Sequence, residues 1–345
     1  MNPFPSKRRP YTLLGLVFLL FLLALAASSA AFLPSLQADA EVDRLNRERL
    51  AALKEAICGN LDSDTAILSP AVSGYVADMG RLPLNLNELL VQGAQVSWTV
   101  DSVSNVSGKF FSPGVAYGWR GPYLNPRPGR VEFRDGWQNV DGSSVEDALN
   151  FGWLLPSSAS ISTLNSNGRG TLTLTSRGKD GLAGGSGYDA DLSASIIDSD
   201  YNVDISQLYV QFKFDELAKK EDFNGQIKNK NVRLAFVTSV NADLSWSTLA
   251  SSACMDMVSS FDSNSSVANT FNVNFNANNS RGLPKRAPWG RRYLAVLTDE
   301  AAGGAGTLKD HIIAVAQCDS PLFLHPRQTL PYSSANPLVM TVYLP

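Results

Sequence analysis

The chain has 345 residues, of which 44% are hydrophobic and 18% are charged, and its formal net charge is −3. This length is enough for two domains with buried cores. A strongly positive net charge favours binding to polyanions, and this chain has none. We therefore expect no nucleic-acid partner.

Residues 11–34 form an uncharged apolar run that follows a basic leader-like segment, residues 1–10, with Lys7, Arg8 and Arg9. At about 1.5 Å per residue this run is long enough to span a bilayer as a helix. The basic flank predicts a cytoplasmic N-terminus, with the bulk of the chain beyond the membrane. A secretory signal peptide cut near residues 27–31 is the alternative.

After the apolar run, residues up to 59 show an amphipathic helical pattern, so we predict one N-terminal helix over 11–59, with its membrane part at 11–34. Apolar residues recur at roughly helical spacing between charged ones at Val42, Leu45, Leu50, Leu53 and Ile57. We expect Pro34 to interrupt or kink this helix and Gly59 to end it.

The rest of the chain divides into two predicted parts with a soft boundary near residue 200. In residues 60–200 we expect a short helix at 87–91 and a strand at 171–175 among loops rich in Gly, Ser and Asn. Residues 201–345 alternate between apolar and polar positions and predict a β-sandwich-like domain. The expected strands are the run from Val203 to Phe214 and the segments 232–240, 271–276, 292–298, 311–316 and 338–344.

Basic residues gather around Pro288, at Lys285, Arg286, Arg291 and Arg292, and we interpret them as a solvated turn. The three cysteines are Cys58, Cys254 and Cys318. In an oxidising compartment Cys254 and Cys318 are the natural pair and Cys58 stays free, and the alternative is that all three are reduced and buried.

The chain shows no sequence pattern of an enzyme. Its two histidines, His311 and His325, have no metal-ligand spacing, and no GxSxG elbow, P-loop or GxGxxG motif is present. Trp119, Tyr123, Trp137 and Trp153 are either a carbohydrate platform or packed core, and core is the preferred interpretation. We therefore expect a non-enzymatic protein. A secreted hydrolase is a third alternative that lacks any catalytic constellation.

Five segments between residues 8 and 195 resemble, in the same order, the major pseudopilin of type II secretion systems and the type IV pilin-like family. The segments are the N-terminal helix, Asp78–Pro83 (DMGRLP), Gly118–Leu124 (GWRGPYL), Asp135–Asn139 (DGWQN) and the Asp–Gly loop Ser176–Leu192. The resemblance implies an α+β fold in which a long helix packs on a small antiparallel sheet. It does not extend to the last 150 or so residues, which would be an additional β domain.

The start of the chain departs from this family. If Tyr11 were the first mature residue, the residue before the cut would be Pro10, and Gly15 would take the place of the family's glutamate. Pro10 argues against prepilin peptidase as a partner that cleaves the leader, and methylation of the new N-terminus would depend on that cleavage. Without that glutamate, the N-terminal amine of a neighbouring subunit would have no partner in an apolar filament core.

The Asp–Gly loop carries the candidate metal site. Asp180, Asp189 and Asp191 lie within 12 residues, with glycines between them that allow a tight fold. Ca²⁺ takes about 6–8 oxygen ligands, which such a loop can largely supply, and a solvated glycine-rich turn is the alternative. The resemblance implies a structural Ca²⁺ held by these three carboxylates and by the carbonyl oxygen of Arg177.

Together these features predict a pilin-like subunit, minor or at the tip, of a type II secretion or type IV pilus-like assembly. We expect it in the bacterial inner membrane or in a pseudopilus, as a part of the protein-secretion machinery. Its partners would be other pilin-like subunits, membrane lipid and an unknown ligand of the C-terminal domain. The alternative is a membrane-tethered periplasmic binding or adhesion module that does not enter a filament.

Overall fold

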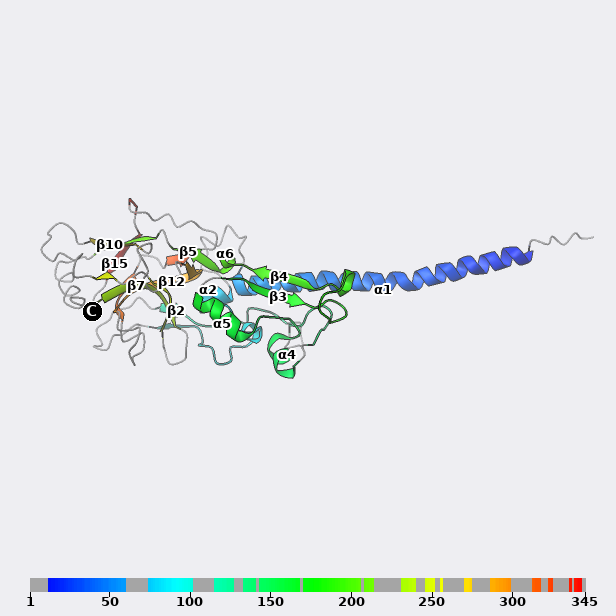
Figure 1. Ribbon diagram of the computed structural model, residues 1–345, viewed down its shortest axis with the longest axis horizontal. Coiled ribbons are helices and arrows are strands. Elements are labelled where there is room, and N and C mark those ends of the chain that lie inside the picture. The colour runs from blue at the N-terminus through cyan, green and yellow to red at the C-terminus, as the bar shows by residue number, and fades with distance from the viewer. Residues whose placement is uncertain are drawn as a thin grey trace, which may run out of the picture.

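Helix α1, Thr12–Cys58, is 47 residues long, and its N-terminal half projects away from the rest of the molecule (Figure 1). It continues through Pro34, so the predicted interruption is absent. The helix ends where predicted, because Gly59 adopts a φ of 74°, a conformation that glycine tolerates best.

The computed structural model describes only part of the chain. The described residues are 12–59, 74–101, 115–126, 133–140, 143–167, 170–205, 208–213, 231–239, 246–251, 255–256, 270–274, 286–298, 312–317, 322–324, 335–336 and 338–342. Cys58 is the free cysteine among them, whereas Cys254 and Cys318, the predicted disulfide pair, lie outside them.

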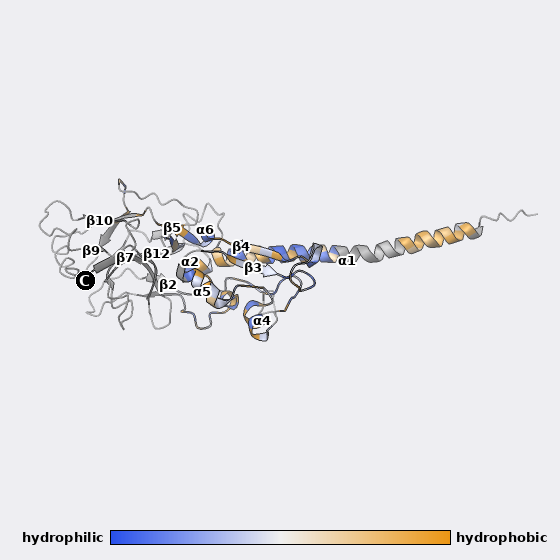
Figure 2. Ribbon diagram, in the orientation of Figure 1, coloured by the Kyte–Doolittle hydropathy of each residue, from blue (hydrophilic) through white to orange (hydrophobic). Residues whose placement is uncertain are grey.

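The two halves of α1 differ in hydropathy, which Figure 2 shows by their colour, and in their surroundings. The large apolar side chains between Leu14 and Leu25 are exposed, from 45% at Leu22 to 76% at Leu14. Near the other end Leu50, Leu53 and Ile57, three or four residues apart, are buried against the globular part. Within the described ranges, no helix has both the length and the apolarity needed to cross a membrane.

A two-stranded antiparallel sheet lies along the buried half of α1. Its strands are β3, Leu172–Ser176, and β4, Leu192–Ile196, and Leu174 is paired with Ala194. Leu172 and Leu174 point into the core, because alternate side chains of a strand face opposite sides. Around this unit lie short helices: α2 (Tyr75–Met79), α3 (Asn87–Leu90), α4 (Ser144–Asn150), α5 (Ser158–Asn167), η2 (Gly187–Asp189) and α6 (Asp198–Tyr201).

Most described strands of the C-terminal part join one nine-stranded mixed sheet. Its order is β10-β6-β15-β13-β12-β7-β8, with β14 paired to β12 and β9 paired to β7. Among the described strands of this sheet, only β15 and β6 pair in parallel. The strands are β6 (Tyr209–Lys213), β7 (Asn231–Ser239), β8 (Trp246–Ser251), β9 (Met255–Asp256), β10 (Thr270–Asn274), β12 (Gly290–Thr298), β13 (Ile312–Gln317), β14 (Leu322–Leu324) and β15 (Leu338–Val342).

The expected short helix and the strands near 171–175, 232–240, 271–276, 292–298, 311–316 and 338–344 are confirmed as elements. The predicted run from Val203 to Phe214 contains two strands, β5 (Asn202–Asp204) and β6. A separate short sheet pairs β1, Thr99–Asp101, with β2, Val115–Tyr117. A sandwich of two packed sheets, and a pilin-like fold for the whole chain, stay predictions.

The basic segment around Pro288 is not a solvated turn, which corrects the sequence interpretation. It forms β11, Arg286–Pro288, which pairs with β5. Ala287 and Trp289 are buried, and Arg286 forms an ion pair with Asp198 at 2.5 Å. The alternation of polar and apolar residues places the apolar side chains inside and the arginine outside.

One hydrophobic cluster includes buried residues from both predicted domains. Leu53 and Ile57 of α1 belong to it, and so do Tyr201, Val203 and Trp289. The backbone of Gly290, at the start of β12, lies so close to α2 that a Cβ would be 2.6 Å from the carbonyl oxygen of Ala77. The boundary predicted near residue 200 therefore falls within a shared core.

Candidate functional site

The Asp–Gly loop, residues 176–191, connects β3 to β4 beside α1. Its tight fold depends on glycine. Gly178 and Gly185 have φ values of 65° and 85°, and a Cβ on either would lie 2.6 or 2.4 Å from the carbonyl oxygen of Asp189. Any side chain at these positions would collide with the backbone. The glycines therefore allow two backbone segments of the loop to lie in contact.

The predicted metal ligands lie on this loop but do not form one cluster. Asp180 Oδ1 accepts a hydrogen bond from the Leu182 N–H at 2.9 Å, and Asp191 Oδ2 accepts one from the Gly184 N–H at 3.0 Å. Asp189 is partly buried, whereas Asp180 and Asp191 are exposed. No group of three His, Cys, Asp or Glu residues in the described part of the chain is placed to hold a metal ion.

The loop offers the oxygen ligands that Ca²⁺ takes, but these ligands do not form one cluster. Carboxylate and carbonyl oxygens are the ligands that Ca²⁺ takes. Asp180 and Asp191 each use one carboxylate oxygen to hold the loop backbone. Arg177, expected to offer its carbonyl oxygen, is partly buried, and its Nε is buried without a hydrogen-bond partner. If Ca²⁺ is bound, Arg177, Asp180, Asp189 and Asp191 are the residues that would hold it.

A buried polar network beneath the loop was missed by the sequence analysis. Its centre is the carboxylate of Asp135, which is 0% exposed. Oδ1 accepts from the Asn139 N–H at 2.9 Å, and Oδ2 accepts from Asn139 Nδ2 and from Ser176 Oγ, both at 2.6 Å. These donors satisfy a carboxylate that burial would otherwise destabilise.

The network continues to α1 and to the loop. Asn46 of α1 is 1% exposed, donates to Ser176 Oγ at 2.8 Å, and accepts from the Gly136 N–H at 3.0 Å. Asn139 Nδ2 also donates to the carbonyl oxygen of Gly178 at 2.9 Å. The turn around Asp135 therefore joins α1, the end of β3 and the start of the Asp–Gly loop. The signal in the sequence was a single polar residue, Asn46, on the apolar side of the helix.

A second contact holds the loop to α1. Lys179 Nζ lies 2.6 Å from Asp39 Oδ2, and this hydrogen bond raises the pKa of Lys179 above its usual value. Asp39 is two turns of helix before Asn46. The loop is thus fixed at two positions along α1.

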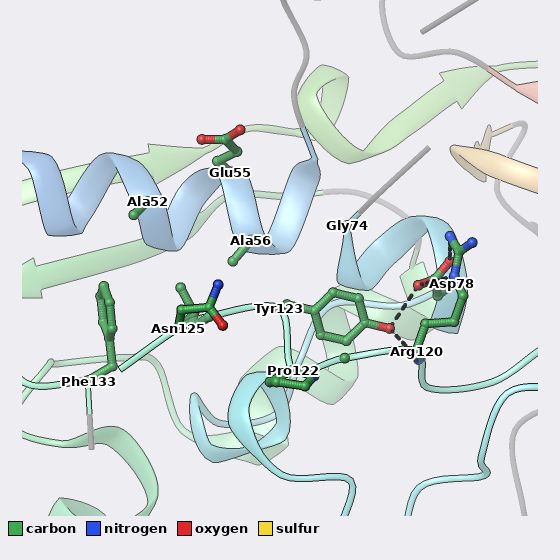
Figure 3. Close-up of a pocket in the computed structure, with 12 residues that line it drawn as sticks. Ala52, Glu55, Ala56, Gly74, Asp78, Arg120, Pro122, Tyr123, Asn125 and Phe133 are labelled. Carbon is green, nitrogen blue, oxygen red and sulfur yellow. Dashed lines mark hydrogen bonds and ion pairs between the residues drawn. The ribbon is translucent and has the colours of Figure 1, made fainter. Parts of the chain in front are cut away.

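The segment Gly118–Leu124 forms a second polar site, drawn in Figure 3. The Arg120 guanidinium binds the buried Asp78 carboxylate through Nε–Oδ2 at 3.0 Å and Nη2–Oδ1 at 2.5 Å. The Tyr123 hydroxyl donates to Asp78 Oδ2 at 2.9 Å, and burial raises the pKa of Tyr123. Both oxygens of this carboxylate are held by the guanidinium or the hydroxyl, so this site favours a structural role.

A similar ion pair also contacts this segment. Arg81 Nη1 is 2.8 Å from Glu88 Oε2, and the Tyr75 hydroxyl donates to the same oxygen at 2.5 Å. Trp119 Nε1 donates to the Glu88 carbonyl oxygen at 2.9 Å. Through Glu88 of α3, these contacts bring together two of the segments on which the family resemblance depends, 78–83 and 118–124.

A cavity of about 680 Å³ lies between α1 and residues 120–125 (Figure 3). One wall is Ala52 and Ala56 of α1, and the other includes Pro122, Leu124 and Phe133. Asp78 and Arg120 at one end are already paired with each other. Among the described residues that line the cavity there is no histidine, serine or cysteine.

The aromatic residues considered as a carbohydrate platform are mostly part of the interior. Trp153 is 0% exposed and donates from Nε1 to the Phe133 carbonyl oxygen at 2.7 Å. Trp119 and Tyr123 pack edge to face, with ring centroids 5.9 Å apart. Trp137 is separate from this pair. Its ring lies beside that of Tyr188 in the Asp–Gly loop, with the ring centroids 6.2 Å apart. These contacts favour the core interpretation.

Comparisons with models of known protein families, with curated proteins and with solved structures found no match to this chain.

Proposed function

We propose that the chain is a non-enzymatic, pilin-like subunit of a type II secretion or type IV pilus-like assembly. The observation that carries this proposal is the single helix α1, Thr12–Cys58, whose two halves face different surroundings. One half packs in the globular core, and the other presents a stretch of exposed apolar side chains from Leu14 to Leu25.

Exposed apolar side chains along a whole stretch of helix are unfavourable in water, because each buried leucine or phenylalanine is worth about 1.5–3 kcal/mol. Lipid or the equivalent helices of other subunits would remove this surface from water. We therefore infer that the exposed apolar half of α1 lies in the inner membrane before assembly and in a helical bundle after it, with the globular part outside.

Two other parts support this role. The Asp–Gly loop, held to α1 by Asn46 and Asp39, would bind a structural Ca²⁺ through Asp180, Asp189 and Asp191. Leu338 of β15 belongs to the same core, and Gly290 of β12 lies against Ala77 of α2, so the nine-stranded sheet would present a binding surface in a fixed position.

The test replaces Leu16–Leu25 with a generic apolar helix of the same length. Packing between helices in a bilayer depends on side-chain shape, whereas partitioning into lipid depends on apolarity alone. We expect the variant to fractionate with the inner membrane as the native chain does, and to crosslink less to other pilin-like subunits. Unchanged crosslinking, or none with the native chain, would refute the assembly proposal.

A membrane-tethered binding module is the second candidate, and the observation in its favour is Gly15. A Cβ added at Gly15 would have no neighbouring atom within 4 Å, so the space beside it is open. The family that the chain resembles has a glutamate at this position, which this chain lacks. Mass spectrometry of the N-terminus separates the candidates. A methylated chain starting at Tyr11 supports a processed subunit, and an intact N-terminus supports a permanent tether.

A further inference from the structure

The cavity between α1 and residues 120–125, drawn in Figure 3, has walls that internal contacts hold in place. The Arg49 guanidinium lies over the Phe133 ring, 5.9 Å from its centroid, and donates to the carbonyl oxygens of the two residues after it at 2.6 and 2.7 Å. Leu124 is 3% exposed, and the Tyr123 N–H donates to a carbonyl oxygen of α3 at 2.8 Å. The cavity is therefore preformed, and its volume of about 680 Å³ is typical of ligand-binding sites.

The two long walls of the cavity are apolar. On α1, Ala52 and Ala56 lie one turn of helix apart and face residues 122–125 in Figure 3. Their small side chains allow the backbone of a ligand to approach the helix closely. Pro122 and Phe133 on the opposite wall provide apolar surface for an aliphatic side chain of that ligand. These walls favour a ligand with a narrow and partly apolar body.

The charges of the lining favour a cation over an anion. Among the described residues that line the cavity, the charged side chains are Glu55, Asp78 and Arg120. Arg120 is paired with Asp78, and its guanidinium also lies 4.4 Å from the centroid of the Trp98 ring. The Glu55 carboxylate is exposed at the rim and has no ion pair or hydrogen bond within the described part of the chain. The lining therefore carries one net negative charge, which an ammonium or guanidinium group would neutralise.

Asn125 offers an amide that a peptide backbone can bind. Its side chain is exposed and points toward α1 in Figure 3. It has no hydrogen-bond partner among the residues that the structure describes. A carboxamide both donates and accepts, so it can bind the C=O and the N–H of a ligand's backbone. Together with the free carboxylate and the apolar walls, this amide suits a peptide.

Membrane lipid does not fit the position of the cavity. The exposed apolar side chains of α1 lie between Leu14 and Leu25. Helix α1 is continuous, so Ala52 lies about 40 Å along it from Leu25, at about 1.5 Å per residue. Lipid around the apolar half would not reach the cavity. The occupant that fits is a partner on the same side of the membrane as the globular part.

We propose that this cavity binds an extended segment of another protein in which a lysine or arginine lies beside a small aliphatic residue. The cation would pair with Glu55, the backbone would bind the Asn125 amide, and the aliphatic side chain would pack between Ala52 and Phe133. Because the walls are fixed before binding, this chain loses little conformational entropy when the segment binds. The inference does not depend on assembly of the chain into a filament.

The probe is an acetylated, fluorescein-labelled peptide of about eight residues, with a central lysine between leucine and alanine. Its binding to the full chain in neutral detergent is measured by fluorescence anisotropy. We expect saturable binding, and the same peptide with glutamine in place of lysine should bind about fivefold more weakly, as for the loss of one exposed ion pair. Equal binding of the two peptides would overturn the proposal.

Two pairs of variants test the cavity itself. Ala52→Phe fills the space beside Phe133 and should weaken binding about tenfold or more, whereas Ala51→Phe, at the exposed neighbouring position, should not. Glu55→Gln should weaken binding about fivefold and reduce its dependence on salt. Glu41→Gln removes the same charge outside the cavity and should do neither. If the two members of either pair behaved alike, the proposal would be wrong.

Other occupants give distinct results in the same assay. Spermidine that displaced the lysine peptide completely at equal concentration would overturn the proposal and assign the cavity to small amines. Self-association of the chain without peptide, abolished by Ala52→Phe, would overturn it in favour of a second copy. Glu55 is exposed, so Glu55→Gln decides the matter even if Ala52→Phe disturbs the fold.

Discussion

The substitution Asp135→Ala should strongly destabilise the globular part, although Asp135 is not one of the predicted metal-binding residues. The Asp135 carboxylate is 0% exposed and accepts three hydrogen bonds, from the Asn139 N–H, Asn139 Nδ2 and Ser176 Oγ. Its removal leaves buried donors without an acceptor. Each such donor costs about 1–3 kcal/mol, and Asn139 Nδ2 keeps its bond to Gly178. We therefore expect a loss of about 4 kcal/mol.

The assay is urea unfolding of the full chain in detergent, followed by tryptophan fluorescence. Ser176→Ala removes one donor and should cost about 1–2 kcal/mol. Arg47→Ala is the matched control, because Arg47 pairs with Asp43 on the exposed side of α1 and should cost less than about 0.5 kcal/mol. If Asp135→Ala were no more destabilising than Arg47→Ala, the network would not join α1 to the loop.

Four further predictions concern the calcium site, Cys58, Gly290 and the disulfide. If the loop binds Ca²⁺, the chain should melt at a lower temperature in chelator, by an amount equivalent to about 2.7 kcal/mol at 100-fold saturation, and Asp180→Ala should abolish the difference. Burial, with a smaller effect of Asp200, raises the pKa of Cys58 from 9.0 to about 12, so the unfolded state ionises first as the pH rises. The native chain should therefore lose about 1.4 kcal/mol between pH 8 and pH 10 relative to Cys58→Ala, and an equal pH dependence in both would contradict the burial of this thiol. Gly290→Ala should destabilise the chain by more than about 2 kcal/mol. The control is Gly93→Ala, because Gly93 also has a positive φ but has open space around it. This substitution should show only the backbone cost of about 1 kcal/mol. Non-reducing peptide mapping should link Cys254 to Cys318, and a bridge that includes Cys58 would exclude that pairing.

Local features of the sequence predicted α1, α3, β3 and most strands of the C-terminal part. Leu50, Leu53 and Ile57 recur at helical spacing and are buried on one side of α1, and Gly59 ends that helix. Alternation predicted β3 and most of the C-terminal strands. These signals depend on side-chain periodicity and on the backbone freedom of glycine, both of which are local properties that a single sequence contains.

The contacts that build the candidate sites were decided by the tertiary structure. Asp135 and Asn139 are buried by Asn46 and Ser176, which lie far from them in the sequence, so no local pattern separates them from an exposed turn. The segment around Pro288 looked solvated because of its arginines, yet pairing with β5 buries Ala287 and Trp289 and leaves Arg286 to bind Asp198. Whether a residue is buried depends on which distant segments of the chain pack against it. Periodicity in the sequence therefore determined where α1, β3 and most C-terminal strands form, and the packing of distant segments determined which polar residues hold them together.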